Sequence, residues 1–250
     1  MTREPSAAPS PSAANDAKRL LRLARVGALA TIDAASGAPL TTLVGVASDW
    51  DGSPLFLMSE LARHTRNLAV DARASLLLTS ERGRGDPLNQ PRLTVGGPVA
   101  RHPDPSSRQR YLTRNPKAGL YASFTDFAIR RLQIESIHFN GGFGRADALF
   151  PTDLLTPTGD IGRLVEAEPR LLEEVESLGA EAISRLAGVP AGRRLWRPVG
   201  LDAEGLDLGA GGSTARVDFS SPALDPAAWR ERLRERLASF AAPREGCDFS

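Results

Sequence analysis

Residues 54–68, which read PLFLMSELARHTRNL, place a helix directly after a strand. The first half is apolar and typical of a β-strand, whereas the second half has helical spacing. Arg63, His64 and Thr65 therefore fall on the first turn of a helix, where free backbone N–H groups and the positive end of the helix dipole attract phosphate. Arg63 adds a bidentate donor and Thr65 a hydroxyl. The same pattern also fits a solvated basic helix start with a cap from Thr65 or Asn67.

Further β-type runs lie on both sides of this stretch, separated by turn sequences such as SGAP. The expected strands are residues 28–33, 40–47, 54–58, 75–79, 92–101 and 129–139. Short helices are expected over residues 17–25 and 105–115. About six strands with few short helices predict a closed or nearly closed antiparallel barrel. The Gly96-Gly97 pair predicts a bulge or a close approach of two backbones.

Two domains are predicted after a disordered tail. Ser, Ala and Pro dominate residues 1–15, which we assign to the tail, and residues 16–150 are assigned to the barrel. Periodicity is lost in the Pro/Thr/Gly-rich residues 151–159, and residues 160–243 are expected to form a small α+β domain. In that domain, helices are expected over residues 161–186, with a division at Pro169, and over 226–240, with strands over 195–201, 205–208 and 213–219.

The composition argues against several classes of function. The 31 Lys and Arg against 30 Asp and Glu leave a net charge of +1, which favours neither nucleic acid nor an anionic membrane as a partner. No run of about 18 apolar residues is present to span a bilayer. The single cysteine, Cys247, cannot form an internal disulfide and is too few for a structural zinc site. No metal site is therefore expected, and the cysteine count fits the cytoplasm.

Three blocks of sequence carry a resemblance to a known family. Residues 54–68, residues 86–94 (DPLNQPRLT) and residues 138–146 (HFNGGFGRA) resemble the haem-utilisation, HugZ/HutZ-like branch of the pyridoxamine-phosphate-oxidase-like flavin-binding split barrels. They occur in the family's order and cover most of residues 18–150. The resemblance implies a mainly β, antiparallel split barrel of the FMN-binding type, followed by a small α+β domain. It also implies a homodimer with the cofactor between the subunits.

The resemblance further implies a set of cofactor contacts. Arg63 and His64 match the Arg-Lys pair that grips the flavin phosphate, with a histidine whose charge is weaker because imidazole is only partly protonated at neutral pH. Residues 42–44 match the strand along the isoalloxazine ring, and the turn after residue 141 is expected near the partner subunit. The implied residues are Thr42, Leu43, Val44, Ser59, Arg63, His64, Thr65, Asn67, Arg92, Gly142, Phe143 and Arg145.

The sequence departs from this family in its C-terminal half. Relatives carry a Met-Asn-x-Asp-His motif on the long helix, where this chain has VESLG at residues 175–179, and no histidine follows His138. An FMN-binding oxidoreductase is therefore expected, with no substrate assigned and catalysis itself left open. The alternatives are a haem-binding or haem-degrading protein that uses His64 and His138, or a non-catalytic dimeric binding module. His102 is expected to be an exposed loop residue.

Overall fold

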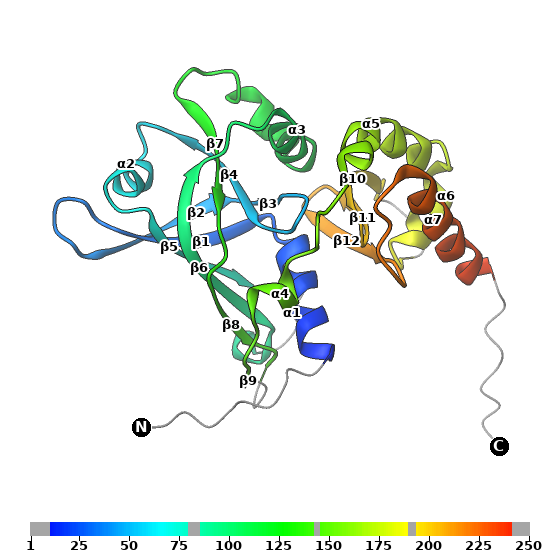
Figure 1. The fold of residues 1–250 in the computed structure, drawn as a ribbon, viewed down its shortest axis with the longest axis horizontal. Helices are drawn as coiled ribbons and strands as arrows, with labels where there is room; N and C mark the ends of the chain where they lie inside the picture. Colours follow the sequence, from blue (N-terminus) through cyan, green and yellow to red (C-terminus); the bar gives the residue numbers. More distant parts are fainter. Residues whose placement is uncertain (1–10, 80–85, 143–145, 190–193, 242–250) are drawn as a thin grey trace. The chain divides into compact units, whose positions relative to one another are not determined.

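The computed structural model describes residues 11–79, 86–142, 146–189 and 194–241. The chain divides into two units, Met1–Pro157 and Thr158–Ser250 (Figure 1). In chain order, unit 1 contains α1 (Pro11–Leu23), β1 (Val26–Ile32), β2 (Pro39–Gly45), β3 (Ala47–Ser48), β4 (Pro54–Ser59), α2 (Arg63–Val70), β5 (Arg73–Thr79), a 3₁₀ turn (Pro87–Asn89), β6 (Arg92–Arg101), α3 (Pro105–Arg114), a second 3₁₀ turn (Pro116–Leu120), β7 (Phe127–Leu132), β8 (Ser136–Asn140), β9 (Ala146–Asp147) and α4 (Pro151–Leu154).

The described strands of unit 1 form one antiparallel sheet that curls on itself (Figure 1). Its main path runs β2-β1-β5-β6-β7-β4-β3, so β2 and β3 are its two ends. Only Val46, which is fully buried, separates these two strands in the chain. Because one residue joins both ends, the sheet has to bend round until they approach each other. The expected fold, a split barrel followed by a small α+β region, is confirmed.

The inner side of the sheet packs around α1. Leu20 and Leu21 of this helix share one core with Leu29 of β1 and Leu76 of β5. The tail expected over residues 1–15 is therefore wrong for residues 11–15, which are helical because Ala13 and the following turns of α1 bury apolar surface in this core. Residues 1–10 lie outside the described residues.

The opposite side of the sheet, which we call the outer face, carries apolar side chains beside polar ones. One row of paired residues crosses five strands of this face and consists of Leu43, Ala28, Leu77, Thr94 and His138. Leu43 is 76% exposed and Leu77 is 38% exposed. Two leucines are therefore open to solvent on this side of the isolated chain.

Strand β6 is the point at which the sheet divides. Along one side it pairs with β8 through its first half and with β7 through its last three residues. Gly96 pairs with Ser136, whereas Val99 pairs with Leu132, so three steps on β6 correspond to four on the opposite segment. The single strand expected over residues 129–139 is therefore wrong, because this bulge breaks it into β7 and β8.

The bulge depends on a glycine. A Cβ atom at Gly97 would lie 1.9 Å from the carbonyl oxygen of Gln133, and one at Gly96 would lie 2.6 Å from the hydroxyl oxygen of Ser136. The two backbones can approach this closely only where no side chain intervenes. The close approach predicted from the Gly96-Gly97 pair is confirmed.

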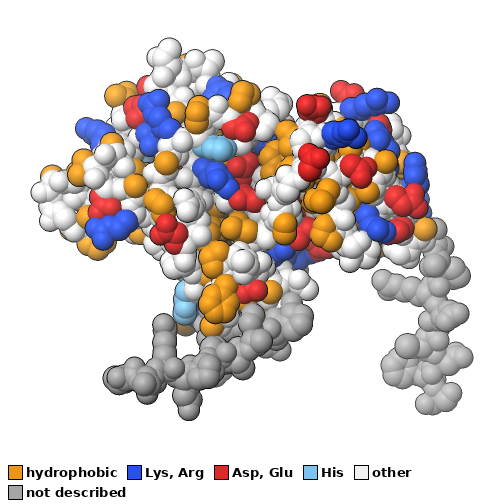
Figure 2. All heavy atoms as spheres, viewed as in Figure 1, with side chains coloured by type: hydrophobic (Ala, Val, Ile, Leu, Met, Phe, Trp, Pro, Cys, Tyr) orange, Lys and Arg blue, Asp and Glu red, His pale blue; other side chains and the backbone are white. Residues whose placement is uncertain are grey.

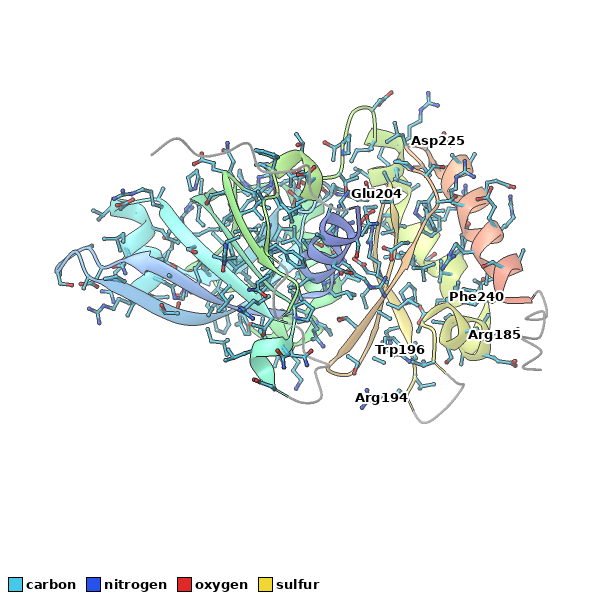
Figure 3. All side chains as sticks on the ribbon, turned by 90° about the horizontal axis from the view of Figure 1, so that it is seen from below. Arg185, Arg194, Trp196, Glu204, Asp225 and Phe240 are labelled. Atoms are coloured by element: carbon cyan, nitrogen blue, oxygen red, sulfur yellow. The ribbon has the colours of Figure 1, made fainter. Side chains whose placement is uncertain are left out.

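The described residues of unit 2 form a three-stranded antiparallel sheet and three helices. Its elements are α5 (Gly162–Glu176), α6 (Gly179–Leu186), β10 (Arg197–Asp202), β11 (Gly205–Ala210), β12 (Ser213–Asp218) and α7 (Pro226–Ala241). Asp225, labelled in Figure 3, caps α7 by accepting hydrogen bonds from the amides of Ala227 and Ala228. On the sheet, the buried guanidinium of Arg216 is held by the buried carboxylates of Asp202 and Asp207.

The helix break in unit 2 differs from the expectation. α5 runs through Pro169 without interruption, because Leu171 and Val175 after it are fully buried and hold the helix in place. The break comes instead at Gly179, whose φ of +84° is unfavourable for other residues. The division expected at Pro169 is therefore wrong.

Candidate functional site

The helix start predicted at Arg63 is confirmed, and it has no side-chain cap. Ala62 occupies the N-cap position of α2 and offers no hydrogen-bond acceptor on its side chain. The amides of Arg63, His64 and Thr65 in the first turn therefore receive no side-chain acceptor from this cap. An anionic group placed there would meet free N–H donors and the positive end of the helix dipole.

Arg63 is held from one side by a carboxylate at the end of β1. Its Nε atom donates to Oδ2 of Asp33 at 2.9 Å, and the arginine side chain is 63% exposed whereas that of Asp33 is 6% exposed. Hydrogen bonds from Arg63 and then from Ser36 lower the pKa of Asp33 to about 2. The pair leaves the outer nitrogens of the guanidinium free for a ligand. Asp33 was missed by the sequence analysis, which had only its place before a turn as a signal.

Asn67 and Thr65 face the protein interior. The side-chain amide of Asn67 donates to the hydroxyl oxygen of Thr31 at 3.1 Å and accepts from the backbone amide of Ala34 at 3.0 Å. Asn67 therefore ties α2 to β1 and to the turn after it. Thr65 is 1% exposed, and its buried hydroxyl has no hydrogen-bond partner among the described residues. Both side chains shape the site from behind in this structure.

His64 meets a residue of β2. Its Nδ1 atom lies 3.2 Å from the hydroxyl oxygen of Thr42, while its Nε2 atom forms no hydrogen bond with the described residues. Partial burial of the ring, and then the nearby charge of Arg130, lower the pKa of His64 below 6.5. The imidazole is therefore neutral at neutral pH, a form that binds a metal through a ring nitrogen and holds no charge for a phosphate.

Buried Arg130 is a second residue that the sequence analysis missed. It lies on β7, and its Nη2 atom donates to both carboxylate oxygens of Glu60, at 3.0 and 3.1 Å. Ser59, just before Glu60, donates its hydroxyl to the carboxylate of Asp126. The segment between β4 and α2 is thus anchored to β7. No local pattern marks Arg130, because its neighbours come from strands far apart in the sequence.

Among residues 42–44, which were expected along the flavin ring, Thr42 alone forms a hydrogen bond with a described residue of α2. Thr42, which is opposite Leu29, points to the inner side of the sheet, and Val44 points the same way into the core. Leu43 points to the outer face. Successive residues of a strand alternate between faces, so these three side chains cannot line one side of a flat ligand together.

Other expected site residues lie at the far end of the sheet. Thr31, which holds Asn67, pairs with Ala74 of β5, whereas Arg92 pairs with Thr79 at the other end of that strand. Five residues of β-strand separate the two positions by about 17 Å. The far group contains Arg92, His138 and Gly142, and Phe143 and Arg145 lie outside the described residues.

His102 is not the exposed loop residue that was expected. Its Nε2 atom lies 3.1 Å from the hydroxyl oxygen of Ser107 and 3.4 Å from a carboxylate oxygen of Asp49. Ser107 is buried and donates to the same carboxylate. Serine and aspartate meet one and the same imidazole nitrogen, so this group is not arranged as a catalytic triad, in which they bind opposite nitrogens.

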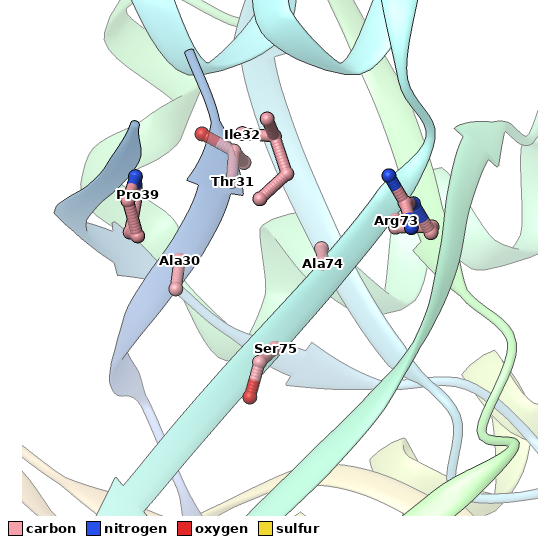
Figure 4. A pocket seen from close by; sticks show the side chains of 7 residues that line it. All are labelled: Ala30, Thr31, Ile32, Pro39, Arg73, Ala74 and Ser75. Atoms are coloured by element: carbon pink, nitrogen blue, oxygen red, sulfur yellow. The ribbon is translucent and has the colours of Figure 1, made fainter. Parts of the chain in front are cut away.

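A hollow of about 210 Å³ lies on the sheet near the end of β1 and is lined by Ala30, Ile32, Pro39, Arg73 and Ser75, among others (Figure 4). Cofactor pockets usually enclose roughly 300–1,000 Å³. This hollow alone is therefore too small and too open to enclose a flavin or a haem.

None of the described helices combines the length and apolar character needed to cross a membrane. On the face drawn in Figure 2, basic and acidic side chains are interspersed among the described residues. That distribution gives no concentrated positive field for a polyanion.

The curled sheet, its internal helix and the polar cluster at the start of α2 define a split-barrel protein with a candidate small-molecule site. Residues 9–155 match the family model described as the β-barrel of CREG. The chain therefore belongs to the CREG β-barrel family.

The chain is also similar to the following three proteins. The protein Atu2129 of Agrobacterium tumefaciens, described as of unknown function, is 33% identical over 91% of this chain and 94% of its own, with a TM-score of 0.78. A haem-binding protein of Mycobacterium smegmatis is 25% identical, with 94% of this chain and 99% of the other covered and a TM-score of 0.55. The chloroplastic non-canonical heme oxygenase HOZ of Arabidopsis thaliana is 31% identical over 115 residues, which are 44% of this chain and 34% of that protein. The match thus spans about a third of this curated relative.

Proposed function

We propose that unit 1 binds haem, with the Nε2 atom of His64 as the ligand of the iron. The observation that carries this proposal is the state of His64: its Nδ1 atom is engaged by Thr42, its Nε2 atom has no hydrogen bond with the described residues, and its pKa is lowered. A neutral imidazole with one ring nitrogen oriented by a neighbour is the usual form of a histidine ligand. The haem-related names of two relatives support the choice of ligand.

The surroundings of His64 also suit the edge of a haem, which carries carboxylate groups. The uncapped amides of α2 and the exposed nitrogens of Arg63 can donate hydrogen bonds to a carboxylate. Asp33 and Asn67 would hold these donors in place without touching the ligand. In this proposal the residues of α2 therefore divide between binding the ligand and fixing the helix.

We further propose that a second copy of the chain packs against the outer face of unit 1. The exposed row of Leu43, Leu77 and their neighbours gives the outer face the character of an interface. A homodimer through this face would cover the row that runs from Leu43 to His138. Light scattering on the purified protein should give the mass of a dimer, and Leu43→Arg should shift it toward the monomer. A monomeric wild-type protein would contradict this part of the proposal.

FMN binding, with an oxidoreductase activity of the HugZ/HutZ-like type, is the second candidate. The uncapped helix start beside Arg63 favours it, because a phosphate would satisfy the free amides. The buried hydroxyl of Thr65 and the uncharged ring of His64 weaken it. Titration with FMN and with riboflavin separates this candidate from haem binding. FMN binding predicts quenched flavin fluorescence with FMN and much weaker quenching with riboflavin, which lacks the phosphate.

The haem proposal is tested by titrating the protein with ferric haem and following the Soret band. The wild-type protein should give a saturable histidine-ligated spectrum, and His64→Ala should lose that spectrum and bind at least ten-fold more weakly. His138→Ala should keep the same ligation, because this residue lies on the other face of the sheet from Thr42. If only His138→Ala removes the ligated spectrum, or if the wild type shows no saturable binding, the proposal fails.

A further inference from the structure

We propose that Thr42 is a positioning residue for His64: its hydroxyl oxygen accepts the Nδ1 proton and holds the ring in the tautomer that leaves a lone pair on Nε2. The contact is 3.2 Å long and joins β2 to α2, which are 22 residues apart in the chain. The consequence for iron binding rests on the proposed haem function. The tautomer itself is a property of the protein alone.

The contact joins two elements that are both attached to β1. Thr42 sits on β2 in register with Leu29 of β1, and a β-branched side chain on a strand has few rotamers. His64 belongs to the first turn of α2, which Asn67 ties to β1 through two hydrogen bonds of its side chain. Both partners are thus held by β1, so the hydroxyl and the imidazole stay at hydrogen-bonding distance without the ligand.

The chemistry of a neutral imidazole makes this contact decisive. The ring carries one proton, and the partner of one nitrogen determines whether the other is a donor or an acceptor. If Thr42 accepts from Nδ1, Nε2 has a free lone pair and can bind a metal. If Thr42 donates to Nδ1, Nε2 carries the proton and can only donate, as a phosphate would require. The direction of the hydrogen bond between Thr42 and His64 therefore determines whether Nε2 can bind a metal or can donate to a phosphate.

The hydrogen-bond partner of Nδ1 also determines how basic the imidazole of His64 is, and therefore how strongly it binds iron. Histidines that bind metals often donate their second N–H to a carboxylate, which raises the basicity of the ring. Thr42 is uncharged, and no described carboxylate bonds to Nδ1 of His64. A bound iron should therefore meet a neutral imidazole of ordinary basicity.

The tautomer can be measured by ¹⁵N NMR of the ligand-free protein, in which only three histidines give signals. The wild type should show the Nδ1-protonated form of His64, and Thr42→Val, which removes the hydroxyl at similar volume, should shift the ring toward the Nε2-protonated form. Thr42→Ser should restore the wild-type signals. Thr41→Val is the matched control, because the adjacent side chain on β2 points to the other face and should leave His64 unchanged. A wild-type ring protonated on Nε2, or no change in Thr42→Val, overturns the inference.

A second readout follows the iron. In ferrous haem complexes, resonance Raman spectroscopy should show a weaker iron–histidine stretch in Thr42→Val than in the wild type, with about ten-fold weaker haem affinity, and Thr42→Ser should recover both. If the tautomer responds to Thr42 but no haem binds, the proposed function fails and the role of Thr42 stands. If haem binds through His64 and both readouts are the same in Thr42→Val, the role of Thr42 fails and the proposed function stands.

Discussion

Gly97→Ala should destabilise unit 1 more than any other single-methyl change at the division of β6. The added carbon would lie 1.9 Å from the carbonyl oxygen of Gln133, whereas ordinary contacts begin near 3.4 Å, so the two backbones would have to separate by about 1.5 Å. Two backbone hydrogen bonds flank this point, from Gln133 to Pro98 at 3.0 Å and from Glu135 to Gly96 at 2.9 Å. Each contributes about 1 kcal/mol, and overpacking adds a similar amount, which makes about 3 kcal/mol.

Urea denaturation, with a thermal scan beside it, measures this loss. A change of about 3 kcal/mol should lower the Tm by roughly 6–12 °C in a domain of this size. Gly96→Ala should cost less, because the hydroxyl of Ser136 that it meets can rotate away. Gly119→Ala is the matched control, since a methyl group there meets nothing within 4 Å, and it should stay within about 0.5 kcal/mol of the wild type. If Gly97→Ala is as stable as the Gly119→Ala control, the bulge does not depend on the glycine.

Three further predictions concern the candidate site. Asn67→Ala removes both hydrogen bonds of a buried side chain, to the amide of Ala34 and to the hydroxyl of buried Thr31, and should cost about 1–3 kcal/mol in urea denaturation; an unchanged midpoint would show that α2 is held by other contacts. The pKa of Asp33 falls from 3.8 to about 2 on folding, so its pairing stabilises the protein above about pH 4 and this contribution is lost as the pH falls toward 2. Asp33→Asn should therefore flatten the decline of Tm in that interval, and an unchanged slope would contradict the role of the Arg63 pair. Arg130→Gln removes a positive charge near His64 and should raise its pKa, measured by NMR titration, and a lower or equal value would contradict the assigned cause.

Local patterns were sufficient for many of the elements. β6 and the start of α2 lie where the spacing of apolar residues and the turn sequences predict them. The glycine pair in β6 also predicted the close approach of two backbones, because only residues without a side chain permit it. These features depend on a few neighbouring residues, and the order of three sequence blocks was enough to indicate the split barrel.

Long-range contacts determined the rest. The helix that replaces residues 11–15 of the expected tail is stabilised by a core to which β1 and β5 contribute, and the break between β7 and β8 depends on a register set by β6. Neither partner is visible in the local sequence. The same holds for His102, whose ring meets Asp49 and Ser107 from different parts of the chain.

The candidate site separates most clearly what the local sequence determines from what the tertiary structure determines. The sequence by itself determined that a helix begins at Arg63 after a strand and that His64 stands in its first turn, because both follow from local spacing. Only the tertiary structure decided that Asp33 pairs with Arg63, that Arg130 and burial keep His64 uncharged, and that Thr42 meets its Nδ1 atom. The protonation of an imidazole depends on burial and on charges within a few ångströms, and the folded sheet brings those groups together from distant parts of the chain.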